Sequence, residues 1–127
     1  MTGTRRRRVF VYGSLLAGEP NHGVLAGAEL VGPALTAPAF ELFDLGAYPA
    51  LVAGGTRAVA GEVYLVDAAV LRRLDALEGH PGFYRRTRIT LEDDRRTEAY
   101  LLRPDQVVER RVVTSGDWRS YRKERRR

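Results

Sequence analysis

The chain is organised around residues 9–16, which read Val9-Phe10-Val11-Tyr12-Gly13-Ser14-Leu15-Leu16. The first of these residues are β-branched or aromatic, and that composition predicts a β-strand. Gly13-Ser14 interrupts the pattern, so the strand should end there and leave several backbone N–H groups without a partner in a sheet. Because Gly13 has no Cβ, a ligand can come close to this backbone, and such a turn suits an anion such as a carboxylate. The alternative is an ordinary turn from strand to loop.

Length and composition favour one folded domain that spans residues 1–127. A chain of this size builds a single core, and its 44% hydrophobic residues argue against disorder. The absence of cysteine excludes structural disulfides, Cys-based zinc sites and a thiol nucleophile. No apolar run reaches the ~20 residues that a membrane-spanning helix needs. The default expectation is a cytoplasmic protein that does not enter a membrane.

The net charge of +5 is concentrated in two terminal segments. Residues 5–8 carry four positive charges and residues 119–127 carry a net of five, which leaves −4 on residues 9–118. Segments 1–8 and 119–127 are therefore predicted to be solvated, flexible basic tails. Such tails can bind polyanions weakly, but no helix-turn-helix or RNA-reading aromatic motif accompanies them, so no specific nucleic-acid partner is expected.

The remaining pattern predicts about six strands and two helices. Asp67 caps a helix over residues 68–78, and Gly79 ends it. Residues 20–25 should form a short helical turn, and residues 106–113 could be strand or helix. Because most strands follow one another through short turns, the chain is predicted to be α+β, a small, mostly antiparallel β-barrel with flanking helices. The expected strands after the first are residues 28–35, 40–45, 50–52, 57–66, 84–92 and 97–102.

Glu78 does not fit its surroundings on the predicted helix. One helix face is apolar and consists of Val70, Leu71, Leu74 and Leu77. Glu78 follows Leu74 by four residues and points into that face, where burial and the helix dipole should raise its pKa. A raised pKa is what a general acid/base near neutral pH requires. Alternatively, the helix ends early and Glu78 turns to water. Asp75, at the edge of the face, is expected to be solvated.

Four segments, taken in order, resemble the γ-glutamylcyclotransferase-like family. They are Tyr12-Gly13-Ser14-Leu15, Gly61-Glu62-Val63-Tyr64, Leu74-Asp75-Ala76-Leu77-Glu78-Gly79 and Tyr84-Arg85-Arg86. Pro20-Asn21-His22 resembles the AIG2-like branch that acts on γ-glutamylamines. The resemblance extends from about residue 9 to residue 102, and residues 115–118 look like the end of small bacterial members.

The resemblance implies a compact β-barrel that cyclises a γ-glutamyl group to 5-oxoproline and releases the attached amine. It implies no cofactor and no metal, with Glu78 as the general acid/base. The α-carboxylate of this small-molecule substrate would lie against the backbone of Gly13, Ser14 and Leu15, with Tyr12 shaping the pocket. Tyr84 matches the family's tyrosine after the catalytic glutamate, and Tyr48 and Tyr100 are further candidates of that kind.

Several alternatives stay open at this level. The same fold could serve as a non-catalytic binding or regulatory module, or the tails could make the chain a polyanion-binding protein. A triad of Ser14, His22 and an aspartate lacks the nucleophile-elbow sequence. His22 and His80 are the only histidines, which is too few to indicate a metal site, and His80 is expected near the pocket entrance. The leaving amine and the oligomeric state are not predicted.

Overall fold

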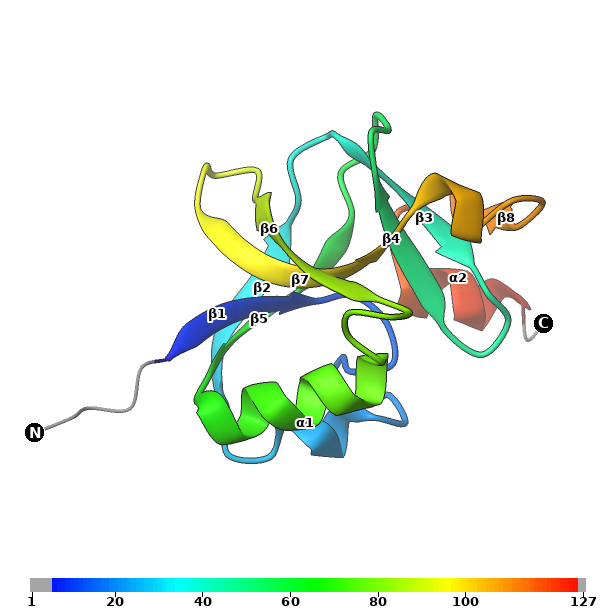
Figure 1. The fold of residues 1–127 in the computed structure, drawn as a ribbon. Helices are drawn as coiled ribbons and strands as arrows, with labels where there is room; N and C mark the ends of the chain where they lie inside the picture. The colour runs from blue at the N-terminus through cyan, green and yellow to red at the C-terminus, as the bar shows by residue number, and fades with distance from the viewer. Residues whose placement is uncertain (1–5, 126–127) are drawn as a thin grey trace, which may run out of the picture.

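The structure is a computed structural model that describes residues 6–125, so the expectations for residues 1–5 and 126–127 lie outside it. A curled β-sheet carries one helix across a face and a second helix near the C-terminus (Figure 1). The strands are β1 (Arg7–Val11), β2 (Glu29–Leu35), β3 (Phe40–Asp44), β4 (Pro49–Ala53), β5 (Ala60–Val66), β6 (Arg85–Thr90), β7 (Arg96–Leu102) and β8 (Arg111–Val112). The helices are α1 (Ala68–Glu78) and α2 (Trp118–Arg125), with 3-10 turns η1 (His22–Leu25) and η2 (Pro104–Gln106).

Strand β7 is the centre of the sheet. Residues 96–101 of β7 pair with β6 in antiparallel fashion, while its other edge pairs in parallel first with β1 and then with β4. The register sets Val9 against Glu98 and Leu51 against Leu101. The remaining pairings are antiparallel, so the α+β class with mostly antiparallel strands is confirmed, and the sheet curls into a half-barrel. The described residues form eight strands, more than expected, because residues 106–113, expected as strand or helix, contain the two-residue strand β8.

The core lies on both faces of the sheet. Val9 and Val11 pack with α1, whereas Phe10 between them packs on the opposite face, as the alternation of side chains along a strand requires. All three are almost fully buried. Trp118, also fully buried, anchors the start of α2 on the Phe10 face.

Helix α1 has the predicted bounds. The Asp67 side chain accepts a hydrogen bond from the Val70 N–H at 2.9 Å, and Gly79 ends the helix with φ of 66°. Val70 and Leu74 are buried, but Leu77, expected on the same apolar face, is 41% exposed. The last turn of α1 reaches past the core, and Leu77 borders the cavity described below.

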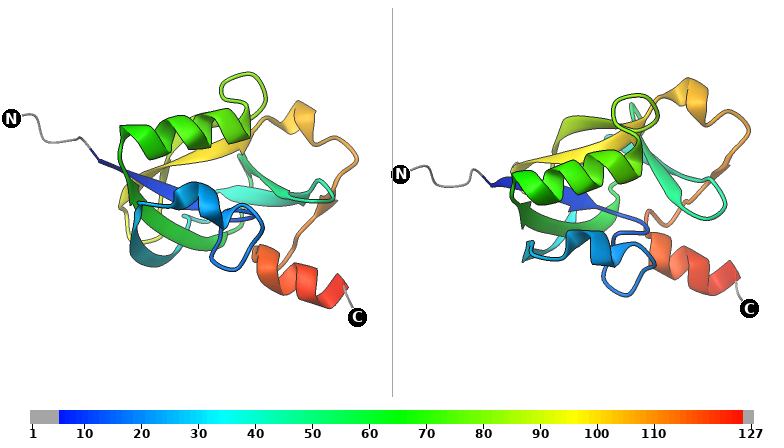
Figure 2. Two further views of the ribbon diagram at one scale, coloured as in Figure 1. Left: turned by 90° about the horizontal axis from the view of Figure 1, so that it is seen from below. Right: turned by 60° about the horizontal axis from the view of Figure 1, so that its bottom comes forward.

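The expected basic tail after Trp118 is instead a helix up to Arg125. Its arginines form ion pairs with acids of the folded body, so they are not simply solvated. The pairs are Arg119–Glu62, Arg122–Glu19 and Arg125–Asp44. Figure 2 shows α2 beside the loop that follows β1, and Arg119 also donates to the Ala17 carbonyl at 3.0 Å. Residues 6–125 contain no helix long and apolar enough to cross a membrane.

Candidate active site

A cavity of about 120 Å³ lies at the carboxyl end of β1, beside the last turn of α1. Here the pairing of β7 with β1 ends and its pairing with β4 begins, so β1 and β4 diverge. The cavity wall brings together every site residue expected from the sequence: Tyr12, Gly13, Ser14, Leu15, Glu78 and Tyr84. The wall also includes residues from other elements, among them Asn21, Tyr48, Pro49, Leu77, Phe83 and Tyr100.

The turn after β1 lines this cavity and contains unpaired backbone donors. Leu16 N–H donates to the Gly13 carbonyl at 3.0 Å and closes the turn. The three preceding N–H groups, of Gly13, Ser14 and Leu15, donate to no acceptor within residues 6–125. Consecutive free N–H groups in a concave turn form a site for an anion.

The reason for glycine at position 13 differs from the expectation. The sequence suggested that a missing Cβ lets a ligand approach, but the Pro49 ring occupies that space. A Cβ at position 13 would lie 2.5 Å from both Cδ and Cγ of Pro49. Gly13 is therefore required by packing between the end of β1 and the start of β4.

Asn21 holds Ser14 in place through two hydrogen bonds. In the sequence, Asn21 stood out only as part of the family motif Pro20-Asn21-His22. Asn21 Nδ2 donates to Ser14 Oγ at 3.0 Å, and the Asn21 N–H donates to the Ser14 carbonyl at 2.8 Å. Because Ser14 Oγ accepts from Asn21, its own O–H can donate elsewhere. His22 Nδ1 lies 2.9 Å from the Leu15 carbonyl, which gives it a role in holding the loop rather than in a triad.

The hydroxyl groups of Tyr12 and Tyr84 each donate a hydrogen bond to a backbone carbonyl. Tyr12 Oη donates to the Tyr100 carbonyl at 2.6 Å and accepts from the Leu51 N–H at 3.2 Å, which connects β1, β7 and β4 where they diverge. Tyr84 Oη donates to the Pro49 carbonyl at 2.7 Å. Burial, with the nearby Glu78, raises the pKa of both phenols far above its ordinary value, so both stay neutral.

Glu78 is the acidic group of the cavity. Burial raises the pKa of its carboxyl from the ordinary 4.5 to about 7. No cation or hydrogen-bond donor of the described chain offsets this cost of burial. The side chain is therefore divided between its protonated and ionised forms near neutral pH, as an acid/base requires.

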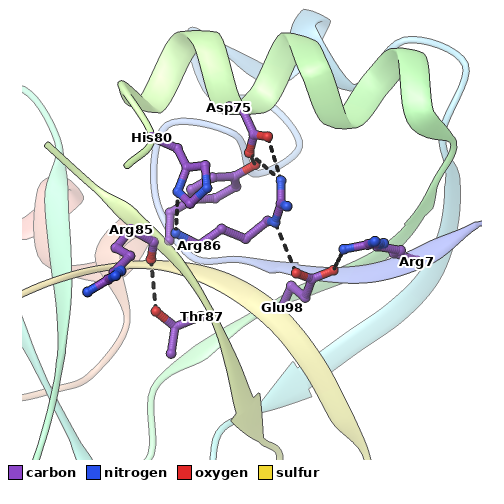
Figure 3. A network of polar contacts seen from close by, with 8 residues as sticks. Arg7, Asp75, His80, Arg85, Arg86, Thr87 and Glu98 are labelled. Carbon is purple, nitrogen blue, oxygen red and sulfur yellow. Dashed lines mark hydrogen bonds and ion pairs between the residues drawn. The ribbon is translucent and has the colours of Figure 1, made fainter. Parts of the chain in front are cut away.

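A polar network supports the helix turn that carries Glu78 (Figure 3). Tyr100 Oη and Arg86 Nη1 both donate to Asp75 Oδ1, each at 2.6 Å, and Arg86 Nε donates to Glu98 at 2.9 Å. The expectation that Asp75 is solvated is wrong, because β6 and β7 place Arg86 and Tyr100 beneath α1.

His80 also belongs to this network rather than to the cavity entrance. Its Nδ1 accepts from the Arg86 N–H at 2.9 Å, and its side chain does not line the cavity. No cluster of three or more His, Cys, Asp or Glu side chains within the described ranges is placed to hold a metal ion.

Comparison with known proteins adds family information to this geometry. A family model described as "Gamma-glutamyl cyclotransferase, AIG2-like" matches residues 9–120. A Vibrio cholerae relative is 44% identical over 110 residues, 87% of this chain and 93% of that protein. The Escherichia coli K12 "Gamma-glutamylcyclotransferase family protein YtfP" is 38% identical over 112 residues, 87% and 95% of the two chains. The human "Gamma-glutamylaminecyclotransferase" is 40% identical over 101 residues, 68% of this chain and 64% of that one.

Solved structures agree with this relationship. The crystal structure of a mouse AIG2-like protein superposes with a TM-score of 0.70 at 32% identity, covering 76% of this chain and 77% of that one. The uropathogenic E. coli protein c4763 superposes with a TM-score of 0.82 over 93% and 96% of the chains, and its 22% identity shows likeness of fold alone.

Proposed function

The chain belongs to the γ-glutamyl cyclotransferase, AIG2-like family, and from that premise we propose that it converts a γ-glutamyl group on an amine to 5-oxoproline and releases the amine. The observation that carries the proposal is the placement of Glu78. A carboxyl with a pKa of about 7 shares one cavity with the three unpaired N–H groups of residues 13–15.

The reaction needs positioning and proton transfer more than a protein nucleophile. The substrate's α-amino nitrogen attacks its own γ-carbonyl carbon, a C–N bond closes the five-membered ring, and the C–N bond to the amine breaks. The nucleophile is tethered to its target, so correct orientation supplies much of the acceleration. The α-ammonium loses two protons and the released ammonium gains two, so no water, oxidant or cofactor is consumed.

Glu78 serves as the proton carrier in this scheme. Its carboxylate takes a proton from the α-ammonium, and the resulting acid returns a proton to the departing nitrogen. A pKa near 7 makes both transfers efficient at neutral pH, because neither form is strongly preferred. The burial that raises this pKa removes part of the water that would otherwise solvate the carboxylate.

The turn after β1 holds the substrate's α-carboxylate. The N–H groups of Gly13, Ser14 and Leu15 are its donors, and the O–H of Ser14 is free to donate because Asn21 supplies the hydrogen bond that Ser14 Oγ accepts. Tyr12 and Tyr84 contribute their rings to the wall, since their hydroxyl groups are hydrogen-bonded to backbone carbonyls.

The test is release of 5-oxoproline from a panel of γ-glutamylamines by wild type, Glu78→Gln and Glu92→Gln. Glu78→Gln keeps the side-chain shape but cannot carry a proton, and Glu92→Gln removes the same charge from an exposed site. We expect activity in wild type and Glu92→Gln, and none above background in folded Glu78→Gln. Equal activity in all three proteins would exclude Glu78 as the acid/base. Binding of γ-glutamylamines by wild type without turnover would instead support a non-catalytic module.

A further inference from the structure

Three large, mostly apolar side chains line the cavity and are half-exposed, and we call them the rim. Tyr48 is 39% exposed, Leu77 is 41% exposed and Phe83 is 43% exposed. Exposed apolar side chains that gather around a cavity are typical of a ligand-binding surface. The other large side chains that are comparably exposed within the described residues are Leu30, Val31, Leu35 and Val108, and none of them lines the cavity.

The rim brings Tyr48, from the loop before β4, beside Phe83 and Tyr84, from the loop after α1. The Phe83 ring lies edge-on to the Tyr84 ring, with centroids 5.0 Å apart, and the Tyr48 ring is 6.4 Å away from Tyr84. Leu77 precedes Glu78 on the last turn of α1. The half-exposed rings of Tyr48 and Phe83 therefore adjoin the buried Tyr84, and Leu77 and Glu78 line the same cavity.

The described residues that line the cavity include no cation for a second charged group. Within the part of the chain that the structure describes, Glu78 is the one charged side chain that lines the cavity. Arg86 of the polar network does not line the cavity, and its guanidinium pairs with Asp75 and Glu98. A carboxylate or ammonium at the far end of a leaving group would meet apolar surface without a counter-charge.

We propose that this rim is the leaving-group subsite, and that it selects γ-glutamyl amides of apolar or aromatic monoamines over γ-glutamyl amino acids and γ-glutamyl diamines. This inference rests on the proposed function. The substrate's α-carboxylate and α-ammonium lie in the inner cavity, and Glu78 stands at the scissile bond. The departing amine then lies outward against Leu77, Tyr48 and Phe83, where burial of its apolar part favours binding.

The first experiment compares kcat/KM for four amides that share the γ-glutamyl half. They are γ-glutamyl-phenethylamide, γ-glutamyl-methylamide, γ-glutamyl-alanine and ε-(γ-glutamyl)-lysine. We expect the phenethylamide to exceed the alanine and lysine compounds by about tenfold or more, the scale of discrimination that an apolar pocket provides. Equal or higher kcat/KM for either charged compound overturns the inference while the cyclotransferase function stands.

The second experiment assigns the preference to the rim. In Phe83→Ala, the ratio of kcat/KM for phenethylamide to that for methylamide should fall about tenfold. The matched control is Val108→Ala, which truncates a side chain 68% exposed and outside the cavity, and leaves the ratio unchanged. An unchanged ratio in Phe83→Ala shows that the rim does not contact the leaving group and overturns the inference.

Measurement of the affinity for the four amides distinguishes a failure of this inference from a failure of the proposed function. If wild type turns over none of the four amides, the proposed function fails, and calorimetry with Glu78→Gln measures affinity for the same compounds. A lower Kd for phenethylamide than for γ-glutamyl-alanine, by about tenfold, supports the subsite without catalysis. Equal Kd values, or no binding of phenethylamide, overturn it.

Discussion

The Pro49 ring occupies the space in which any side chain at position 13 would begin, because a Cβ on Gly13 would lie 2.5 Å from Pro49 Cδ. This contact joins the end of β1 to the start of β4, at the point where the pairing of β7 with β1 ends and its pairing with β4 begins. It also sets the position of the turn that lines the cavity.

Gly13→Ala is therefore expected to destabilise the protein by about 1–3 kcal/mol, the usual cost of overpacking, and to lower kcat/KM for a γ-glutamylamine more than tenfold. Urea unfolding and steady-state kinetics measure the two effects. Gly23→Ala is the matched control, since a Cβ there meets no atom within 4 Å. Wild-type stability and activity in Gly13→Ala would show that Pro49 moves aside at little cost.

The activity should depend on the ionisation of Glu78. Burial raises its pKa to about 7, and the carboxylate form must be present to take a proton from the substrate. We expect kcat/KM to rise with pH up to about 7 and to fall tenfold per pH unit well below it. A pH profile of kcat/KM checks this, and an acidic limb near 4.5 would show that the carboxyl keeps its ordinary pKa.

The ionisation of Glu78 should also make the stability of the protein depend on pH. The folded protein holds the Glu78 proton more tightly than the unfolded chain, so the contribution of Glu78 to stability falls as pH rises from 4.5 to about 7. Above pH 7, Glu78→Gln should be more stable than wild type, by at most about 3 kcal/mol. Urea unfolding of both proteins at pH 5 and pH 8 tests this, and a difference that does not grow with pH contradicts it.

The network below α1 should contribute measurably to stability. Arg86→Met leaves Asp75 half-buried without its cation, and we expect a loss of about 2 kcal/mol, the scale of hydrogen bonds to charged groups. Arg103→Met, which removes an exposed ion pair with Asp105, should cost less than about 1 kcal/mol. Thermal or urea unfolding compares them, and equal losses would mean that the network adds nothing beyond a surface pair.

Tyr84→Phe distinguishes a structural hydroxyl from one that binds substrate. Because Tyr84 Oη donates to the Pro49 carbonyl, its removal should cost about 1 kcal/mol of stability and lower kcat/KM less than tenfold. The measurements are unfolding and steady-state kinetics on the same preparation. A loss of kcat/KM above a hundredfold with wild-type stability would place the hydroxyl on the substrate instead.

Features of the fold that depend only on residues close together in the sequence could be predicted from it. The cap by Asp67 and the left-handed Gly79 are local signals, so the bounds of α1 agree with the structure. The position of Glu78 beside Leu74 indicated a raised pKa for the same reason, and burial is the cause that the structure supports. By contrast, the helix at residues 119–125 was not predicted. Its basic composition alone resembled a solvated tail, whereas its arginines form ion pairs with acids that are distant in sequence.

The sequence by itself determined the α+β class, the strand that ends at the Gly13 turn, the helix that carries Glu78 and the family resemblance, because local propensity and motif order carry that information. Only the tertiary structure decided that Pro49 lies against Gly13, that Asp75 pairs with Arg86, and that Tyr48 and Phe83 flank Tyr84. Several of these contacts depend on the parallel pairing of β7 with both β1 and β4. Such long-range pairings are set by packing of the whole sheet, which no short stretch of sequence encodes.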